Sequence, residues 1–473
     1  MAGRRANSAY MLLGQIVGKA GLFGSLMIFS RILEDGAFGE LLLSVSIGLI
    51  VVFLSDMGVS MLVTRRIATG EPVNSVFTAA LVTRTVLSSI ALAVVMLSVS
   101  LAGYSSRQIL LVFLVSSAFV LNGYCESAFA LFRAREQMVY EGAARILHGL
   151  LGIGLALYAL YSGRGVVFAG STYILREIPA LVFAGVALVS VTKFRPDLRR
   201  ESLGKVRPLF AAALPLGLAG IMIAAGQRLD GVFIKAFLGD AAIAAYQQCL
   251  KLLEALVLIV TPTLLPGALF PVLCLAVKKG WGEARMRVAW MTELFLVLAF
   301  LLIIPLWAGE DHVLRTVWGE DFLRGSSPGD VGMTYRLVLL TLPVAYMFNM
   351  FMSTTIATER QRKVLPAVFF PLMMEMALFL LLIPFLGIVG AALSHMAFLA
   401  SGAVWMAWNL HGRYGSTGFL RGARRPLISF IPAFIILLLS PLEGILNGVL
   451  AVAAFLAVWI SFGGLGTVPV RRS

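Results

Sequence analysis

The sequence contains little of what secreted and metal-binding proteins use. It has 3 cysteines and 4 histidines among 473 residues, and charged residues make up 13%. The cysteines lie within or at the ends of apolar runs, which predicts buried small side chains and no disulfide framework (Cys125, Cys249 and Cys274). The histidines are scattered singly, so no metal site is expected (His148, His312, His395 and His411).

Several motifs of well-known enzyme classes are also missing. The chain has no Gly-x-x-x-x-Gly-Lys-Ser/Thr phosphate loop, which argues against ATP hydrolysis. It has no His-Glu-x-x-His zinc motif and no pair of closely spaced cysteines. We therefore expect neither an enzyme nor a bound cofactor; movement of a substrate fits the sequence better than chemistry on one.

Apolar sequence, in contrast, is abundant. Hydrophobic residues make up 59% of the chain, and its mean hydropathy of +0.93 is typical of membrane proteins. Runs of about 20–28 mostly apolar residues follow one another, and each is long enough to cross a bilayer. We predict an all-α polytopic membrane protein with about 14 transmembrane helices. They are expected at residues 8–31, 40–64, 75–101, 108–132, 142–162, 166–191, 209–237, 242–268, 286–307, 334–357, 364–386, 388–410, 427–441 and 445–462.

The basic residues gather in every second gap between these runs. Arg65 and Arg66, Arg133 and Arg135, and the segment 193–207 lie in such gaps, whereas the gap at Arg107 has a single basic residue. Cytoplasmic loops are the ones enriched in Lys and Arg, so both termini are predicted to be cytoplasmic, in a bacterial inner membrane. These loops also explain the net charge of +14. Nucleic-acid binding is not expected, because no basic stripe with interleaved aromatic residues occurs.

The longest basic loop, 193–208, divides the chain near its middle. The segments 31–39 and 236–244 echo one another, since each places an acidic residue and small residues at a turn after a helix. Six helices on each side of the loop predict two pseudo-symmetric lobes related by an axis along the membrane normal. We expect lobes at 1–195 and 196–412, followed by two additional helices and a basic tail at 413–473.

Ionisable residues inside the spans require an explanation, because each costs about 2.5–3.5 kcal/mol to insert. The basic ones are Lys19, Arg84, Arg176, Arg228 and Lys251, and the acidic ones are Asp56, Glu126, Glu177, Asp230, Glu254, Glu293 and Glu375. They either neutralise one another in buried pairs, which the near balance of charges supports, or line a hydrated cavity. For the set as a whole we favour a cavity lined by some of them, because satisfying so many charges in a dry bundle is costly. Arg145 and Arg336 lie near helix ends, where we expect them to snorkel to the interface.

Several segments are similar to a known family. The opening, with Asn7, Gly14, Lys19, Ser30-Arg31, Phe38-Gly39, Ser55-Asp56 and Arg65, resembles the start of Wzx-type oligosaccharide flippases. These form the polysaccharide-transporter branch of the superfamily that also holds multidrug and toxin extruders. The second half resembles the same family at Ala213-Leu-Pro215, Asp230, Leu238-Gly239, Tyr246, Lys251-Leu-Leu-Glu254 and 313–322.

The resemblance implies a flippase that moves undecaprenyl-diphosphate-linked oligosaccharide units across the cytoplasmic membrane by alternating access, for cell-surface polysaccharide such as O-antigen or exopolysaccharide. It implies two six-helix lobes around a central cavity, rocking about the 193–208 connector. Membrane lipids, a polysaccharide polymerase and a chain-length regulator are the implied partners, and we expect a monomer. The peptidoglycan-precursor flippases of the same superfamily fit less well at the start of the chain.

Arginine pairs bidentately with phosphate oxygens, so a diphosphate head group suits a cationic cavity. On this basis the expected substrate-binding residues are Lys19, Arg84, Arg176, Arg228 and Lys251, and the candidates for ion coupling are Asp56, Glu126, Asp230 and Glu254. Two alternatives stay open. One is a cation-coupled multidrug exporter of the same fold, and the other is an integral-membrane polysaccharide polymerase using the outside loop 308–333.

Overall fold

The computed structural model describes residues 2–263, 269–318, 328–440 and 444–464, without the side chains of residues 2–9 and of a few others. This part of the chain contains helices and no strand. Among the described residues, 11 helices are long and apolar enough to cross a membrane. The predicted fold class is thus confirmed: the protein is an all-α, multi-pass membrane protein. The total of about 14 spans and the side on which the termini lie remain predictions.

The chain forms two compact units, described separately below. Unit 1 contains the residues up to Ile221, and unit 2 contains most of the residues from Met222 on. The division between the units falls inside a helix, α9 (Val206–Leu238). The predicted lobes at 1–195 and 196–412, and the pseudo-symmetry between them, remain predictions.

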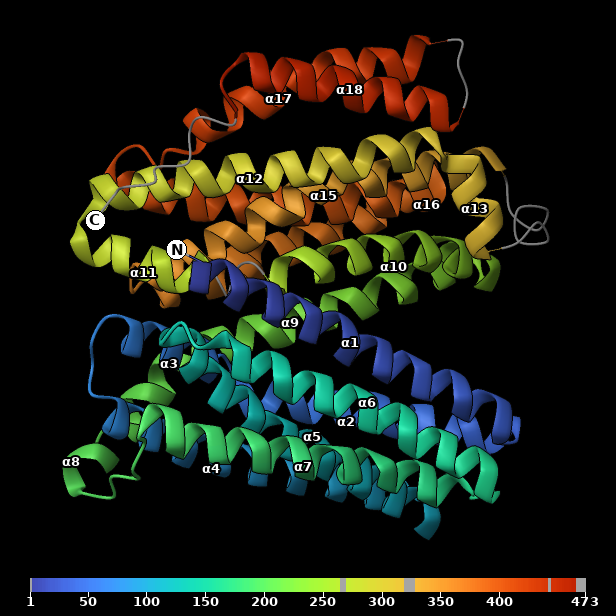
Figure 1. Cartoon of the computed structure of the whole chain (residues 1–473). Coiled ribbons are helices and arrows are strands. Elements are labelled where there is room, and N and C mark those ends of the chain that lie inside the picture. Colours follow the sequence, from blue (N-terminus) through green and yellow to red (C-terminus); the bar gives the residue numbers. More distant parts are fainter. Residues whose placement is uncertain (1, 264–268, 319–327, 441–443, 465–473) are drawn as a thin grey trace. The chain divides into compact units, whose positions relative to one another are not determined.

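Unit 1 consists of helices that run roughly alongside one another (Figure 1). They are α1 (Ala2–Ile32), α2 (Asp35–Asp56), α3 (Val59–Ala68), α4 (Val73–Leu101), α5 (Ser106–Ala134), α6 (Met138–Ser162), α7 (Val166–Thr192), α8 (Arg200–Leu203) and the first half of α9. Helix α5 packs against α2, α3, α4 and α7, so it lies at the centre of the unit. Its polar residues are therefore placed to meet side chains from several neighbours.

Glycines allow α1 and α6 to approach each other closely. A Cβ atom built on Gly14 would lie 2.6 Å from the backbone of Gly142, and one on Gly21 would lie 2.4 Å from the backbone of Gly149. Small residues at a helix interface let two backbones meet in a membrane, where no hydrophobic force drives helices together. The glycines of the first span thus serve helix packing.

Substituting one of these glycines tests the interface. Gly21→Ala places a methyl group where backbone already lies, so we expect the helices to separate, destabilising the protein by about 1–3 kcal/mol. Gly24→Ala is the matched control, because its new Cβ would meet Ile153 at an ordinary 3.6 Å. Thermal unfolding midpoints in detergent compare the two; equal midpoints would contradict the close contact.

The predicted connector between the lobes is fastened to unit 1. The backbone N–H of Asp197 donates to the Thr78 hydroxyl at 2.9 Å, and Lys205 Nζ donates to the Ser75 hydroxyl at 2.8 Å. Phe194 packs edge-on against Phe77 with ring centres 4.9 Å apart. These contacts tie the 193–208 segment to α4, so it is an ordered part of unit 1.

Unit 2 contains the second half of α9 and the remaining helices (Figure 1). They are α10 (Asp240–Thr263), α11 (Phe270–Lys279), α12 (Trp281–Ala308), α13 (Glu310–Trp318), α15 (Pro328–Ala357), the 3₁₀ turn η2 (Gln361–Lys363), α16 (Val364–Tyr414), α17 (Phe419–Leu439) and α18 (Ile445–Ser461). Helix α16 is interrupted at Gly387, whose φ of 59° is non-helical. Its two arms match the spans predicted at 364–386 and 388–410.

The last two helices, α17 and α18, pack on α12. Trp459 of α18 donates its indole N–H to Glu293 at 3.1 Å, and Arg425 of α17 lies 3.7 Å from the same carboxylate. The buried acid of α12 thereby receives its partners from the C-terminal pair. Helix α17 begins at Phe419, earlier than the predicted 427, so the thirteenth span is not short.

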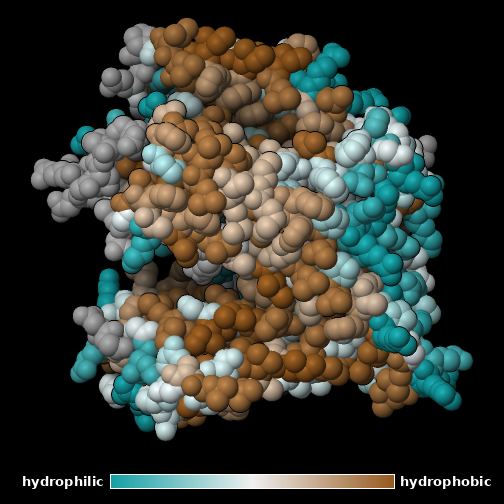
Figure 2. Space-filling model, turned by 180° about the vertical axis from the view of Figure 1, so that it is seen from behind, coloured by the Kyte–Doolittle hydropathy of each residue, from teal (hydrophilic) through white to brown (hydrophobic). Residues whose placement is uncertain are grey.

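The outer surface of the helices matches a lipid environment. Figure 2 shows hydrophobic side chains over most of the visible face, with hydrophilic residues gathered mainly toward one edge. Large apolar residues are strongly exposed on separate helices, as at Leu97 with 61%, Val182 with 60% and Phe385 with 81%. Such exposure is unfavourable in water and expected against acyl chains.

Candidate substrate-binding site

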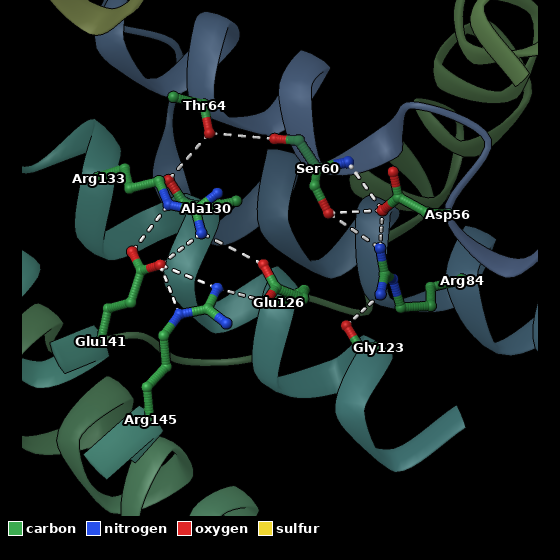
Figure 3. Close-up of polar contacts among 10 residues, drawn as sticks. All are labelled: Asp56, Ser60, Thr64, Arg84, Gly123, Glu126, Ala130, Arg133, Glu141 and Arg145. Carbon is green, nitrogen blue, oxygen red and sulfur yellow. Dashed lines mark hydrogen bonds and ion pairs between the residues drawn. The ribbon is translucent and has the colours of Figure 1, made fainter. Parts of the chain in front are cut away.

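Arg84 is held inside unit 1 by an aspartate and by backbone. Helix α2 ends at Asp56, and Met57 and Gly58 adopt left-handed conformations before α3 begins. The Asp56 carboxylate accepts a hydrogen bond from the Gly58 N–H at 3.1 Å and one from the Ser60 hydroxyl at 2.6 Å. Arg84 of α4 forms an ion pair with Asp56 and donates to the carbonyl of Gly123 (Figure 3). Its side chain is 1% exposed, so its charge is neutralised within the protein.

Four further charges form a network beside this pair. Arg133 Nε donates to Glu141 Oε2 at 2.8 Å, and its Nη2 lies 3.2 Å from Glu126 Oε2. Arg145 bonds to the same two carboxylates, Glu126 at 2.5 Å and Glu141 at 3.0 Å (Figure 3). The two guanidinium groups and two carboxylates balance in charge. Removing any one of them would leave an uncompensated charge in the protein interior, which is strongly destabilising. The expectation that Arg145 snorkels is wrong: its side chain is 20% exposed and joins α5 to α6.

Arg176 has a different environment. Its guanidinium lies over the ring of Tyr173, 4.1 Å from the ring centre, and its residue is only 3% exposed. Within the described part of the chain, neither its Nε nor the Tyr173 hydroxyl has a hydrogen-bond partner. Unsatisfied buried polar atoms are costly, so the guanidinium is a group that an anionic ligand would satisfy.

A cavity of about 150 Å³ opens within unit 1 beside the charged network. Its polar lining comes from α1, α5, α6 and α7, namely Gln15, Lys19, Asn122, Arg145, His148 and Glu177. Glu177 accepts from Asn122 at 3.2 Å and lies 3.1 Å from His148 Nδ1. Lys19 and Arg145 are the cationic side chains of this lining. We call these six residues the unit 1 pocket.

The predicted site residues fall into distinct places. Lys19 lines the unit 1 pocket, whereas Arg84 and Arg176 are buried in unit 1. Lys251, in α10 of unit 2, is exposed, and among the described residues no ion pair joins it to Glu254. The Arg228 side chain lies outside the described residues. Convergence of all five cations in one chamber therefore remains a prediction.

The four candidates for ion coupling also have definite surroundings. Asp56 and Glu126 are bound to arginines in unit 1. Asp230 is 2% exposed in unit 2 and accepts from Gln247 at 3.3 Å. Glu254 lines a separate cavity in unit 2.

Sequence reasoning missed several members of the pocket. His148 was predicted to be an isolated histidine, yet it pairs with Glu177. A local signal existed in α6, since Glu141, Arg145 and His148 are spaced by four and three residues and share a helix face. Their partners on α5 and α7 are distant in sequence, so only the fold reveals them.

The fold is that of transporters of the MOP superfamily. A MOP superfamily transporter from Pyrococcus furiosus superposes with a TM-score of 0.73 at 13% identity, covering 90% of this chain and 95% of that one. A multidrug resistance MATE family transporter in an outward-facing conformation gives 0.71 at 14% identity, covering 90% and 96%. A MATE transporter of Vibrio cholerae gives 0.70 at 13% identity, covering 87% and 99%.

Residues 5–275, more than half of the chain, match the family described as polysaccharide biosynthesis protein. The chain belongs to this family, which agrees with the resemblance found in the sequence. No curated protein sequence matches it. The chain thus combines membership of a polysaccharide-biosynthesis family with the fold of membrane transporters.

Proposed function

We propose that the protein is a flippase for undecaprenyl-diphosphate-linked oligosaccharide units, working by alternating access in the bacterial cytoplasmic membrane. The observation that carries the proposal is the unit 1 pocket, in which Lys19 and Arg145 lie beside the amides of Gln15 and Asn122 and beside the paired Glu177 and His148. Cations suit a diphosphate, and the amides of Gln15 and Asn122 suit sugar hydroxyls. Membership of a polysaccharide-biosynthesis family supports a glycan cargo.

The volume of the pocket limits how much of the substrate head group it can hold. A volume of about 150 Å³ is below the roughly 300–1,000 Å³ of a complete ligand site. The pocket therefore accommodates part of the head group, a phosphate or one sugar. The charged network gives it rigidity, because Arg145 is held by carboxylates from two helices, Glu126 of α5 and Glu141 of α6.

Removing one pocket cation tests the proposal. Lys19→Gln is expected to lower the rate of translocation about 10- to 100-fold, since one charge-assisted hydrogen bond is worth about 1.5–3 kcal/mol. Arg107→Gln is the matched control, because it removes one cation from a side chain that is 57% exposed. The measurement is the movement of a fluorescent lipid-linked oligosaccharide across the bilayer of proteoliposomes. Equal rates for both variants would exclude the pocket as the head-group site.

Cells lacking the protein distinguish the flippase from the two alternatives. Lipid-linked single repeat units confined to the inner leaflet support a flippase, and units that cross without lengthening support a polymerase. Increased sensitivity to cationic drugs without such accumulation supports an exporter. The polymerase alternative depends on the acidic residues of the 308–333 loop. Of these, Glu310 begins α13 and pairs with Arg336 at 2.5 Å. Glu320 and Asp321 lie outside the described residues.

A further inference from the structure

The segment that joins α7 to α9 lies at the surface of the membrane. Helix α7 ends at Thr192 and α9 begins at Val206, and both lie in stretches apolar enough to cross a bilayer. The short helix α8 between them lies at one end of the unit 1 helices (Figure 1). We call residues 193–207 the basic connector.

The basic connector is held at the depth of the lipid head groups. Its contacts with Ser75, Phe77 and Thr78 all involve the first two turns of α4. Helix α4 has 29 residues, more than the roughly 20 that cross the hydrocarbon core, so its first turns reach the head-group layer. Within the connector, the Ser202 hydroxyl donates to Asp197 at 2.6 Å. The segment is therefore ordered in the layer that lipid phosphates occupy.

The basic connector presents a dense positive charge. Five of its basic side chains are exposed, namely Lys193, Arg195, Arg199, Arg200 and Arg207. Among the described residues, the one ion pair that they form joins Arg199 to Asp197 at 3.9 Å, and the Arg199 side chain is 87% exposed. Glu201 is the one exposed acid of the connector. The preference for positive loops on one side of a membrane accounts for the sign of this charge, and the charge is also available to an anionic partner.

Two leucines are exposed among these cations. Leu198 is 68% exposed and Leu203 is 41% exposed, on either side of Arg199 and Arg200. An exposed leucine gains nothing in water, whereas at a bilayer surface it is buried among the upper parts of the acyl chains. Basic residues combined with apolar ones are the pattern of segments that lie in the membrane interface. The connector therefore has both features that attach a chain to an anionic bilayer.

We propose that the basic connector binds the head groups of anionic phospholipids, with Leu198 and Leu203 inserted between them. The guanidinium fork suits a lipid phosphate, because it donates two parallel hydrogen bonds. A negatively charged leaflet attracts a polybasic segment next to a membrane-spanning helix, which is where these cations lie. The bound lipids hold the ends of α7 and α9 at the membrane surface. The inference requires a membrane protein but no particular cargo.

A spin label at residue 198 measures whether the connector enters the bilayer. The three native cysteines are buried, so an introduced cysteine is labelled selectively in the full-length protein. Leu198→Cys is compared with Glu201→Cys, an exposed position in α8, in nanodiscs of phosphatidylcholine alone or mixed with phosphatidylglycerol. We expect the label at 198 to be shielded from a water-soluble nickel complex only when phosphatidylglycerol is present, and the label at 201 to stay accessible in both. Equal access at 198 in the two lipid compositions overturns the proposal.

Neutralising the arginines tests the electrostatic part of the proposal. Each basic side chain near an anionic surface contributes about fivefold to binding. The variant Arg195→Gln/Arg199→Gln/Arg200→Gln should therefore bind phosphatidylglycerol about 100-fold more weakly. All three side chains are exposed, so we expect the fold to be retained. The label at 198 should then be accessible to nickel in every lipid mixture.

The matched control removes the same charge from exposed side chains of unit 2, in Arg413→Gln/Arg421→Gln/Arg424→Gln. Shielding of the label at 198 should persist in this variant. At about 1 M salt the Debye length falls to about 3 Å, and shielding should be lost without any substitution in the connector arginines. Shielding that survives either the connector substitutions or this salt overturns the proposal. Shielding that is present in cell membranes and absent from nanodiscs assigns the connector to a protein partner, which overturns it as well.

Discussion

Replacing Arg133 with glutamine should destabilise the protein by about 3–5 kcal/mol, the cost of breaking a buried ion pair from one side. Arg133 binds Glu126 and Glu141, and Glu141 is 0% exposed. Without this guanidinium, Arg145 alone faces both carboxylates. A net negative charge then remains between α5 and α6, and the Glu141 part of it is fully buried.

Arg135→Gln is the matched control for this prediction. Arg135 is two residues away in sequence, is exposed, and donates only to the backbone carbonyl of Thr192 at 3.0 Å among the contacts described. Thermal unfolding in detergent should show a large loss of midpoint for Arg133→Gln and a small one for Arg135→Gln. The double variant Arg133→Gln/Glu141→Gln restores charge balance and should recover part of the loss. Equal midpoints for the two single variants would show that the network contributes little to stability.

Arg176→Ala should abolish translocation while leaving the protein folded and inserted, and the same is expected of Arg228→Ala. The structure supports this for Arg176, because its buried guanidinium stacks on Tyr173 and its Nε has no hydrogen-bond partner in the described part of the chain. Its unpartnered Nε is a donor that a phosphate oxygen would satisfy. Arg176→Lys should recover only part of the rate, because lysine keeps the charge and loses the planar fork.

Arg164→Ala is the control on the neighbouring loop, since Arg164 also stacks on a ring, that of Phe168 at 5.7 Å, but is exposed. Flipping rates in proteoliposomes and unfolding midpoints are measured on the same samples. A loss of rate at an unchanged midpoint identifies a substrate contact. Normal rates in both Arg176→Ala and Arg228→Ala would contradict a cationic site for the diphosphate, whereas a parallel fall in midpoint would assign Arg176 a role in the fold.

The ionisable residues within the spans had two interpretations from sequence, mutual neutralisation or a hydrated cavity. In unit 1 the structure contains examples of both. Arg84 and Asp56 neutralise each other, while Lys19 lines a pocket. Arg145 does both, since it is paired with Glu126 and also borders the pocket. Sequence spacing gives the face of one helix, but whether that face meets a carboxylate or a void depends on the neighbouring helix.

The sequence by itself determined the class of the protein and most of its helices. A bilayer forces every backbone polar group to be satisfied within its own segment, so long apolar runs become helices wherever they occur. Even the break at Gly387 falls between two predicted spans. The helices follow from local composition, so they could be predicted without knowledge of the fold.

Only the tertiary structure decided which charges meet. Glu177 and His148 lie on different helices, and Glu375 and His395 meet only because α16 folds back at Gly387. Such contacts depend on the angle and rotation with which helices pack, and glycine pairs such as Gly21 and Gly149 set these locally. Charge pairing is therefore a property of the assembled bundle, whereas the existence of each helix is a property of its own residues.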